Sequence, residues 1–517
     1  MAEQEVLLQI PEQPEQVRLE QASGGSTPKL RPINRRQQVM GMIDVEELIG
    51  EDHKARAIWS LTGSLDLSGF LEPIRSQEGS AGRSAWDPRL LVSTWLYAYS
   101  EGIGSAREIE RVMEWEPGLR WLSGLEVINH HTLSDFRIDH KAGLDGLFAQ
   151  LLAVLEQHQL VDLERVMHDG TRVRARAGAD TFRREKTLRE RLKTAEDLVR
   201  QMGDPAAENM GSRRREAAQA RARREQEERL QRAVEELKQL QAASGNNKPD
   251  QELRVSLTEP EARVMKHGDG GYQPSYNLQV STDAKQKVIV AVSLSQSASD
   301  SGLLEKAVET VEETTGKKPS QMVVDGGFVT RPNIQKMADQ QIDLIAPLPN
   351  KEGQQRAALE SSGIDAAFGP PAFAWDREKN LLVCPAGKQL AYRQKGNKRG
   401  VPFLIFRARA ADCSTCEFRS QCCPNHSAHG RMVSLLQEEE RVLAFQRKMQ
   451  TEQAKAIYKQ RGPVAEFPNA WIKDILGLRK FRVSGLVKAS TEALWVCLTY
   501  NVLIWRRLVW LKGPNAA

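Results

Sequence analysis

Apolar residues recur at helical spacing from Val39 to about Leu160. One helix is predicted to start at Asp87-Pro88, because Asp87 can cap the first turn and Pro88 suits the first helical position. The pattern favours a compact all-α domain over residues 38–162. The preceding residues, 1–37, are polar with little apolar periodicity, so we expect a disordered leader.

The apolar pattern changes after the helical region. Val166 to Val173 reads as a short buried strand containing Asp169. Dense Arg and Glu follow, with leucines at helical spacing, which predicts an inserted hairpin of two helices at about 182–245. A strand hairpin, a helix, a strand ending at Asp325, a second helix and a further strand come next. This order predicts an α/β domain with a mixed sheet, whose first and fourth strands each end in an aspartate.

Two further segments bear on this α/β domain. Ser299-Asp300-Ser301 is expected to cap the helix that follows the strand hairpin. The apolar segment Thr491–Trp510 has the length of a membrane span, but Asn501 and Arg506-Arg507 interrupt it, so we expect a core helix. The predicted organisation is an α/β domain made of residues 163–349 and 436–512, with an insertion at 350–435.

Length and charge narrow the class of protein. A chain of 517 residues is expected to form two to four domains. The net charge of +5 is modest, but Arg and Lys occur in blocks, which favours a polyanionic partner without demanding one. A helical domain with helix–turn–helix character can place a helix in the DNA major groove, although a scaffold or dimerisation role fits equally well. The first residues lack the pattern of a signal peptide, so we expect a cytoplasmic protein.

The insertion at 350–435 holds five of the six cysteines. Its Cys-x-x-Cys pair has the spacing of a zinc knuckle, and two further cysteines can complete a site of four thiolates. Free or redox-active cysteines are the alternative, because the second half of the site is not a Cys-x-x-Cys pair. The candidate zinc ligands are Cys384, Cys413, Cys416 and Cys422.

Three acidic residues are candidates for a metal site. An Asp-Gly pair such as Asp169-Gly170 is by itself an ordinary turn signal, and Glu466 alone is typical of a solvated surface acid. Together with Asp325 they are candidates for one shared metal site, because strand ends hold carboxylates rigidly and a nearby helix can add a third carboxylate. Carboxylate oxygens suit Mg²⁺ or Mn²⁺, and a pair of such ions can cleave a phosphodiester with little further help from the protein.

Basic and aromatic residues accompany these acids. Arg461 and Lys473 flank Glu466 in the sequence and can bind phosphate groups as cations. Tyr458 can hydrogen-bond or stack in the same cleft, and Arg172 follows Asp169 closely. These four residues are the candidate DNA contacts.

The spacing Tyr458-x2-Arg461-x4-Glu466-x6-Lys473 resembles the signature of bacterial insertion-sequence DDE transposases. The segments around Asp169 and Asp325 resemble the two aspartate motifs of that family. The sheet order with a terminal helical acid resembles the RNase H fold. One departure concerns the third acid: Phe467-Pro468-Asn469 follows it, where the family often has Pro and then Phe-Gly. Further resemblances lie at Glu259–Lys266, Gly270–Tyr272, Gly485–Lys488 and Leu498–Asn501.

The resemblance implies an RNase H-like catalytic domain that cuts DNA at the ends of a mobile element and joins them to target DNA. It implies two Mg²⁺ (or Mn²⁺) ions held by Asp169, Asp325 and Glu466, terminal inverted repeats as DNA partner, and a homodimer when two ends are paired. An RNase H-like nuclease or resolvase is one alternative. A catalytically inactive DNA-binding regulator derived from a transposase is another.

Overall fold

The computed structural model of the chain describes residues 42–72, 74, 84–200, 210–244, 253–347, 357–398, 401–424, 429–436 and 440–513. The predicted leader at 1–37 lies outside these residues. Among them, one large apolar core includes side chains from the N-terminal helices, the central sheet and the last long helix. Smaller apolar clusters lie in the cysteine-containing region and at the base of the inserted helices.

The N-terminal region is helical, as predicted. Asp87 caps the third helix by accepting a hydrogen bond from the N–H of Arg89 at 2.8 Å, and Pro88 is the first helical residue. Nearly every residue of this helix is buried, so it forms the centre of the helical region. The elements are η1 (Glu46–Leu48), α1 (Lys54–Gly63), α2 (Ser68–Leu71), α3 (Pro88–Ser100), α4 (Ala106–Val112), α5 (Pro117–Ser123), α6 (His130–Asp139) and α7 (Lys141–Gln157).

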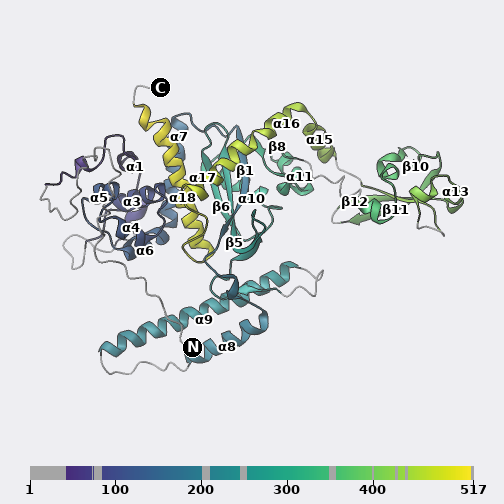
Figure 1. The fold of residues 1–517 in the computed structure, drawn as a ribbon. Helices are drawn as coiled ribbons and strands as arrows, with labels where there is room; N and C mark the ends of the chain where they lie inside the picture. Colours follow the sequence, from purple (N-terminus) through teal and green to yellow (C-terminus); the bar gives the residue numbers. More distant parts are fainter. Residues whose placement is uncertain are drawn as a thin grey trace, which may run out of the picture. The chain divides into compact units, whose positions relative to one another are not determined.

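The central sheet is mixed, and its strand order is β4-β5-β1-β7-β8, with β6 also on β5. Strand β1 is antiparallel to β5, where Asp169 faces Val280, and parallel to β7, where Val166 faces Met322. Helices pack on the sheet (Figure 1). The strands are β1 (Arg165–Arg174), β4 (Arg263–Lys266), β5 (Tyr272–Asp283), β6 (Ile289–Ser295), β7 (Gln321–Val323) and β8 (Asp343–Ile345), and the helices between them are α10 (Leu304–Thr315), η4 (Gly326–Phe328) and α11 (Arg331–Asp339).

The predicted insertion is a hairpin of two packed helices. Leu188 of the first helix packs with Ala233 and Leu237 of the second and with Val255 of a short strand at the base. The hairpin therefore has an apolar seam of its own, while its outer faces are charged. Its elements are η2 (Ala179–Thr181), β2 (Phe182–Arg183), α8 (Glu185–Arg200), α9 (Met210–Ser244) and β3 (Val255–Ser256).

The cysteine-containing region has its own antiparallel sheet, in the order β13-β12-β11-β10-β9. Phe406, Leu382 and Leu390 are fully buried in it. The elements are η5 (Ala366–Phe368), η6 (Pro370–Ala372), β9 (Ala374–Asp376), β10 (Leu381–Val383), β11 (Gln389–Lys398), β12 (Val401–Ala408), α13 (Ala410–Ser414), α14 (Arg419–Cys422) and β13 (Met432–Leu436).

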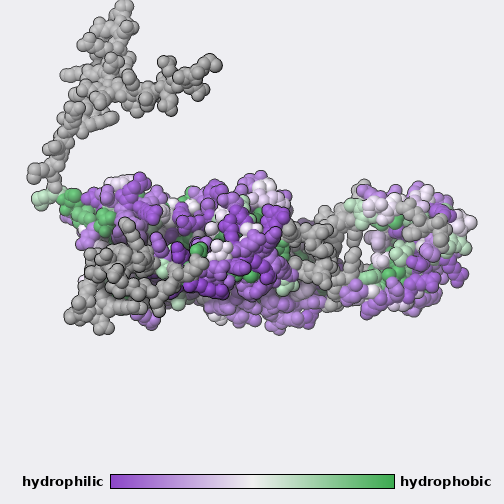
Figure 2. Space-filling view, turned by 90° about the horizontal axis from the view of Figure 1, so that it is seen from below, coloured by the Kyte–Doolittle hydropathy of each residue, from purple (hydrophilic) through white to green (hydrophobic). Residues whose placement is uncertain are grey.

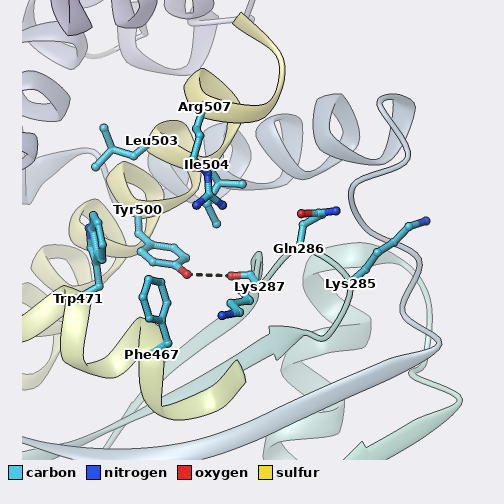
Figure 3. Close-up of a pocket in the computed structure, with 9 residues that line it drawn as sticks. All are labelled: Lys285, Gln286, Lys287, Phe467, Trp471, Tyr500, Leu503, Ile504 and Arg507. Carbon is cyan, nitrogen blue, oxygen red and sulfur yellow. Dashed lines mark hydrogen bonds between the residues drawn. The ribbon is translucent and has the colours of Figure 1, made fainter. Parts of the chain in front are cut away.

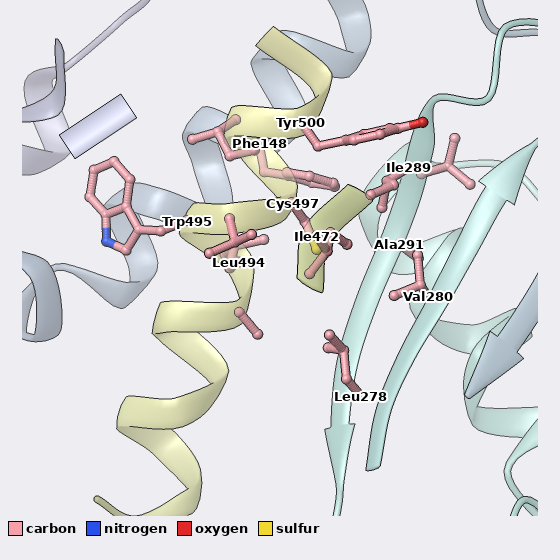
Figure 4. Close-up of a cluster of buried hydrophobic side chains, with 14 of the residues drawn as sticks. Phe148, Leu278, Val280, Ile289, Ala291, Ile472, Leu494, Trp495, Cys497 and Tyr500 are labelled. Atoms are coloured by element: carbon pink, nitrogen blue, oxygen red, sulfur yellow. The ribbon is translucent and has the colours of Figure 1, made fainter. Parts of the chain in front are cut away.

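The last long helix, α18, is the core helix that its apolar sequence predicts. It packs against α3 and α7 on one side and against β6 on the other. Figure 4 shows Trp495 of α18 on the side away from the sheet, and Cys497 and Tyr500 of α18 on the side that faces Ile289 of β6. Among the described helices, none is long and apolar enough to cross a membrane. The C-terminal elements are α15 (Glu440–Met449), α16 (Glu452–Lys459), η7 (Gly462–Glu466), α17 (Phe467–Asp474), α18 (Leu486–Leu508) and η8 (Trp510–Lys512).

A buried charged group joins α6 to α18. Glu492 is fully buried, and one of its carboxylate oxygens lies 3.7 Å from Arg137 of α6 and 3.7 Å from Arg482. The backbone N–H of Arg482 donates to its other oxygen at 2.9 Å. Trp495, one turn later, donates its indole N–H to the carbonyl of Arg137 at 3.1 Å. Polar contacts as well as apolar packing therefore attach the helical region to α18.

Hydrophilic residues cover most of the visible described surface in Figure 2. The large apolar side chains that are exposed occur at scattered positions along the chain, such as Trp115, Val264 and Val487. Single exposed apolar residues of this kind are normal for a folded protein in water.

Candidate active site

Strand β1 presents its side chains alternately to the two faces of the sheet, which separates His168 from Asp169. His168 is buried, and its two ring nitrogens lie 2.9 Å from the Ser281 hydroxyl and 2.8 Å from the Gln279 amide oxygen. Asp169 faces α17, where Asn469 donates a hydrogen bond to its carboxylate at 3.1 Å. The strand thus holds the backbone of Asp169 in place, while the carboxylate of Asp169 contacts α17.

Asp325 lies beside Asp169 because their strands are parallel neighbours. Strand β7 ends at Val323, and the carboxylate of Asp325 accepts the N–H of Gly327 at the start of η4. Burial raises the pKa of Asp169, the Arg461 guanidinium lowers it, and the charge of Asp325 raises it again. The two aspartates are therefore close enough to interact electrostatically.

Arg461 connects Asp169 to Glu466. Its Nη1 lies 3.4 Å from Oδ1 of Asp169, and its Nη2 lies 3.1 Å from Oε1 of Glu466. The Glu466 side chain is 62% exposed, whereas the Asp169 side chain is 18% exposed. Glu466 is the last residue of the π-helical turn η7 and directly precedes α17, so it lies just before the helix rather than in its first turn.

The other predicted contacts also gather here. Lys473, one turn after Asn469 on α17, donates to the Thr171 hydroxyl. Burial and the charge of Arg479 lower the pKa of Lys473, and the charge of Asp169 opposes this. The Arg461 guanidinium lies 5.9 Å from the centre of the Tyr458 ring. Tyr458, Arg461, Glu466 and Lys473 thus converge on the face of β1 from which Asp169 projects.

Arg172 points to the opposite side of β1, toward Asp300 at 3.5 Å. The prediction that Asp300 helps to cap a helix is wrong, because α10 begins only at Leu304. The Asp300 carboxylate instead accepts hydrogen bonds from Asn277 at 2.7 Å and Gln279 at 3.1 Å. These amides belong to polar residues that are buried in β5, and buried polar groups are normally hydrogen-bonded.

The contacts of Asp300, on the other side of β1 from Asp169, and the contact of Asn469 with Asp169 are not among those that the sequence predicts. A Cβ atom added to Gly170 would lie 2.5 Å from the Asp300 carboxylate, so the glycine after Asp169 leaves room for that acid. The alternating buried Asn277, Gln279 and Ser281 were a signal in the sequence that a polar partner lies near β5.

The three predicted acids lie on the side of β1 that α17 covers, but they do not form a closed metal site. Among the described residues, no three His, Cys, Asp or Glu side chains are placed so that a single ion could bind them all. The donor chemistry nevertheless suits a hard cation, since Asp169 and Asp325 are carboxylates whose charges repel each other, and Arg461 now compensates the charge of Asp169.

The face of α17 opposite Asn469 is aromatic. Phe467 and Trp471 lie 5.4 Å apart between ring centres and line a hollow of about 180 Å³ with Tyr500 and Lys287 (Figure 3). The Tyr500 hydroxyl donates to the Lys287 carbonyl at 3.1 Å, and the Lys287 ammonium lies 4.7 Å from the Phe467 ring centre. These contacts connect α17 to α18 and to the β5–β6 turn.

The predicted zinc ligands line one small cavity of about 30 Å³ together with Cys423. The backbone N–H of Lys388 donates to the Cys384 sulfur at 3.2 Å, and that of Arg431 to the Cys413 sulfur at 3.4 Å. As noted, no three of the described cysteines are placed to share one ion. The cavity brings the predicted cysteines together, but a zinc site stays a prediction.

Comparison with known proteins gives two family matches. A family described as "Transposase domain (DUF772)" matches residues 43–139, in the helical region. A family described as "Transposase DDE domain" matches residues 383–504, a range that includes Arg461, Glu466 and Lys473. Together these matches support a DDE-type transposase of an insertion element. The transposase match does not extend to Asp169 or Asp325, whose roles rest on the geometry above.

Other comparisons add little to this transposase assignment. No curated protein matches the chain. Solved structures that match include a piggyBac transposase synaptic complex with hairpin DNA, determined by cryo-electron microscopy. The identity is 9%, the match covers 92% of this chain and 76% of that one, and the TM-score is 0.31. A score of this size does not establish a shared fold.

Proposed function

We propose that the protein is an active DDE transposase that cleaves DNA at the ends of its element and transfers the freed strands into target DNA. The observation that carries this proposal is the grouping of Asp169, Asp325 and Glu466. Asp169 lies within β1, Asp325 follows the parallel neighbour β7, and Arg461 connects Asp169 to Glu466. The family matches make DNA the natural substrate of such a site.

The catalytic domain is proposed to be RNase H-like. Its support is the strand order, in which β6 and β5 are antiparallel neighbours, β5 is antiparallel to β1, and β1, β7 and β8 are parallel. The proposed domain limits stay those predicted: 38–162 for DNA binding, 163–349 with 436–512 for catalysis, and 350–435 as the insertion.

Asp169, Asp325 and Glu466 would hold two Mg²⁺ or Mn²⁺ ions, which would activate the attacking oxygen and stabilise the leaving oxygen. Arg461 now balances the carboxylates and would be free to bind a backbone phosphate once cations take over that role. Lys473 and Tyr458 would bind flanking DNA, as would Arg172 from the other side of β1, where it now pairs with Asp300. The helical region would bind the terminal inverted repeats, in the cytoplasm, with two chains pairing two ends.

A cleavage and joining assay with Asp169→Asn tests this proposal. The DNA flanking the gene supplies candidate element ends, and a plasmid serves as target. The variant should lose Mg²⁺-dependent cutting while still binding the ends, because it lacks one metal-binding carboxylate but keeps the basic surfaces. Asp145→Asn, at an exposed acid on α7, should keep full activity. Cutting by the Asp169→Asn protein at the wild-type rate would reject the site.

The same assay separates the alternatives. A nuclease or resolvase would cut the ends but would never join a supplied pre-cut end to the plasmid. An inactive regulator would bind the ends and neither cut nor join them with any divalent ion.

A further inference from the structure

A second hollow, of about 580 Å³, lies away from the carboxylates at the base of the inserted hairpin. It is formed where β1 ends, where α9 passes and where α18 begins. Arg176, Arg229, Arg232 and Lys488 contribute four positive charges to its lining, and Glu261 contributes one negative charge. Its remaining lining consists mainly of small polar and glycine residues, without an aromatic side chain. We refer to it as the basic groove.

The cations of the basic groove have no carboxylate partner within the part of the chain that the structure describes. Arg229 donates only to the carbonyl of Glu225, at 3.3 Å. Nearby charges behave differently: Lys238 of α9 pairs with Glu235, and Arg263 pairs with Glu236. Four cations left facing one hollow repel one another, and a polyanion is the partner that would relieve this repulsion.

Helix α9 holds the arginines of the basic groove in place. The pair Arg263–Glu236 attaches α9 to β4, and both side chains are largely buried, at 13% and 18% exposure. Leu237 is buried in the hairpin seam. Arg229 and Arg232 are three residues apart, so they project from the same face of the helix. The groove therefore presents its charges on a fixed frame.

A line of cations connects the basic groove to the carboxylates. Strand β1 and its continuation run seven residues from Asp169 to Arg176, which spans roughly 23 Å. Lys473, which donates to Thr171, and Arg174 lie between, and both act on His267: burial lowers the pKa of this histidine, the charge of Asp269 raises it, and the charges of Lys473 and Arg174 lower it. Positive charge thus extends from the proposed cleavage site to the groove.

We propose that the basic groove binds the phosphate backbone of duplex DNA, roughly seven nucleotides from the bond that is cut. This rests on the proposed function. The offset follows from the span along β1 and the 3.4 Å between phosphates of one strand. The groove lacks aromatic side chains on which unpaired bases could stack, which favours a duplex over a single strand.

Binding of a random-sequence duplex of about 30 base pairs, measured by fluorescence anisotropy against salt concentration in EDTA, tests the groove. The double variant Arg229→Glu/Arg232→Glu should bind more weakly, and its slope of log K against log salt should fall by about 2, since each lost phosphate contact removes about 0.9. The control Arg191→Glu/Lys193→Glu changes the charge equally at exposed positions of α8 and should keep the wild-type slope.

A wild-type slope in the double variant would overturn the proposal and would leave an acidic protein segment as the occupant of the groove. An equal reduction of the slope in the control variant would overturn it as well. If circular dichroism shows that the double variant does not fold, Lys488→Glu decides, with an expected slope reduction of about 1. EDTA removes divalent ions, so this result is independent of cleavage. Cleavage at the wild-type rate by the Asp169→Asn protein would reject the catalytic site but would not affect the DNA-binding measurement on the groove.

Discussion

Asp169 occupies a costly position. Its carboxylate is mostly buried and close to Asp325, and both effects raise its pKa, while Arg461 and Asn469 favour its charged form. A fold retains such a group when the charge has a use, and a cation-binding site is one such use. The contacts of Asn469 and His168 therefore yield predictions about function and stability, respectively.

Asn469→Ala should slow DNA cleavage by about 10- to 100-fold, the usual effect of removing a group that orients a metal ligand. Loss of its hydrogen bond to Asp169 raises the pKa of that acid, so the acidic limb of the rate–pH profile should move to higher pH. Trp471→Phe, on the other face of α17, should leave the profile in place. A slower variant with an unmoved profile would show that Asn469 only supports the fold.

His168 should make stability depend on pH. Burial lowers its pKa from 6.5 to about 4. Between pH 6.5 and pH 4, His168 is protonated in the unfolded chain but stays neutral in the folded chain. The free energy of unfolding therefore decreases as the pH falls through this range, and the stabilisation is fully present only above pH 6.5. The gap between the two pKa values corresponds to about 3 kcal/mol.

Urea unfolding of metal-free protein at pH 7 and pH 4.5 measures this loss. His168→Gln should be less stable at pH 7 but should lose less stability on acidification than the wild type. His158→Gln, at an exposed histidine, should follow the wild type. Equal acid losses in wild type and His168→Gln would contradict the assignment of this effect to His168.

The sequence patterns predicted the positions of the acidic residues, but they did not predict which side chains contact these acids in the fold. Asp169 and Asp325 could be predicted because each lies in or directly after a short apolar strand segment, which is a local signal. The contact between Asp300 and Asn277 depends on how the loop after β6 folds back over β5, and the contact of Asn469 depends on how α17 crosses β1. Such crossings are tertiary and leave no periodic trace in the sequence.

At the scale of elements, long and regular apolar patterns predict helices where the structure has them. The last helix, predicted at Thr491–Trp510, is α18 at Leu486–Leu508, and so begins five residues earlier than predicted. The first strand of the predicted hairpin, in which polar and apolar residues alternate at 276–281, is β5, which runs from Tyr272 to Asp283 and is therefore longer than that pattern. Its extra residues pair with β4, a short strand whose four residues carry too little pattern to be recognised alone.

The cysteine-containing region offers a prediction about metal. We expect about one zinc per chain in purified protein, measured by mass spectrometry, because four cysteines with suitable spacing line one cavity. Cys413→Ser should remove the zinc and lower the melting temperature of this region. Cys497→Ala, at a cysteine buried in α18, should keep the zinc. Wild-type protein free of zinc, with titratable thiols, would favour free or redox-active cysteines instead.

At the scale of the whole molecule, the buried group around Glu492 joins α6 to α18. Glu492→Met leaves Arg137 buried without its carboxylate and should cost about 3–5 kcal/mol of unfolding free energy. The double variant Arg137→Met/Glu492→Met should cost less than the sum of the single variants, since no charge from this pair is then left uncompensated. Urea unfolding measures all three.

The exposed pair Lys317–Glu156 is the matched control for this cycle. Glu156→Met should cost less than about 1 kcal/mol, because both partners stay in water. Strictly additive costs for Arg137 and Glu492 would mean that the two charges do not stabilise each other.

The position of α18 also has a consequence for synthesis of the chain. Arg137 and Trp495 touch across 358 positions of sequence. A ribosome adding about 5–20 residues per second needs roughly 20 to 70 s to cover that distance. During this interval the nascent helices of the first third expose the apolar surface that α18 later covers, and Arg137 lacks its counter-charge. Chaperones would have their main opportunity then, and a transcript interrupted before codon 486 would yield an aggregation-prone product.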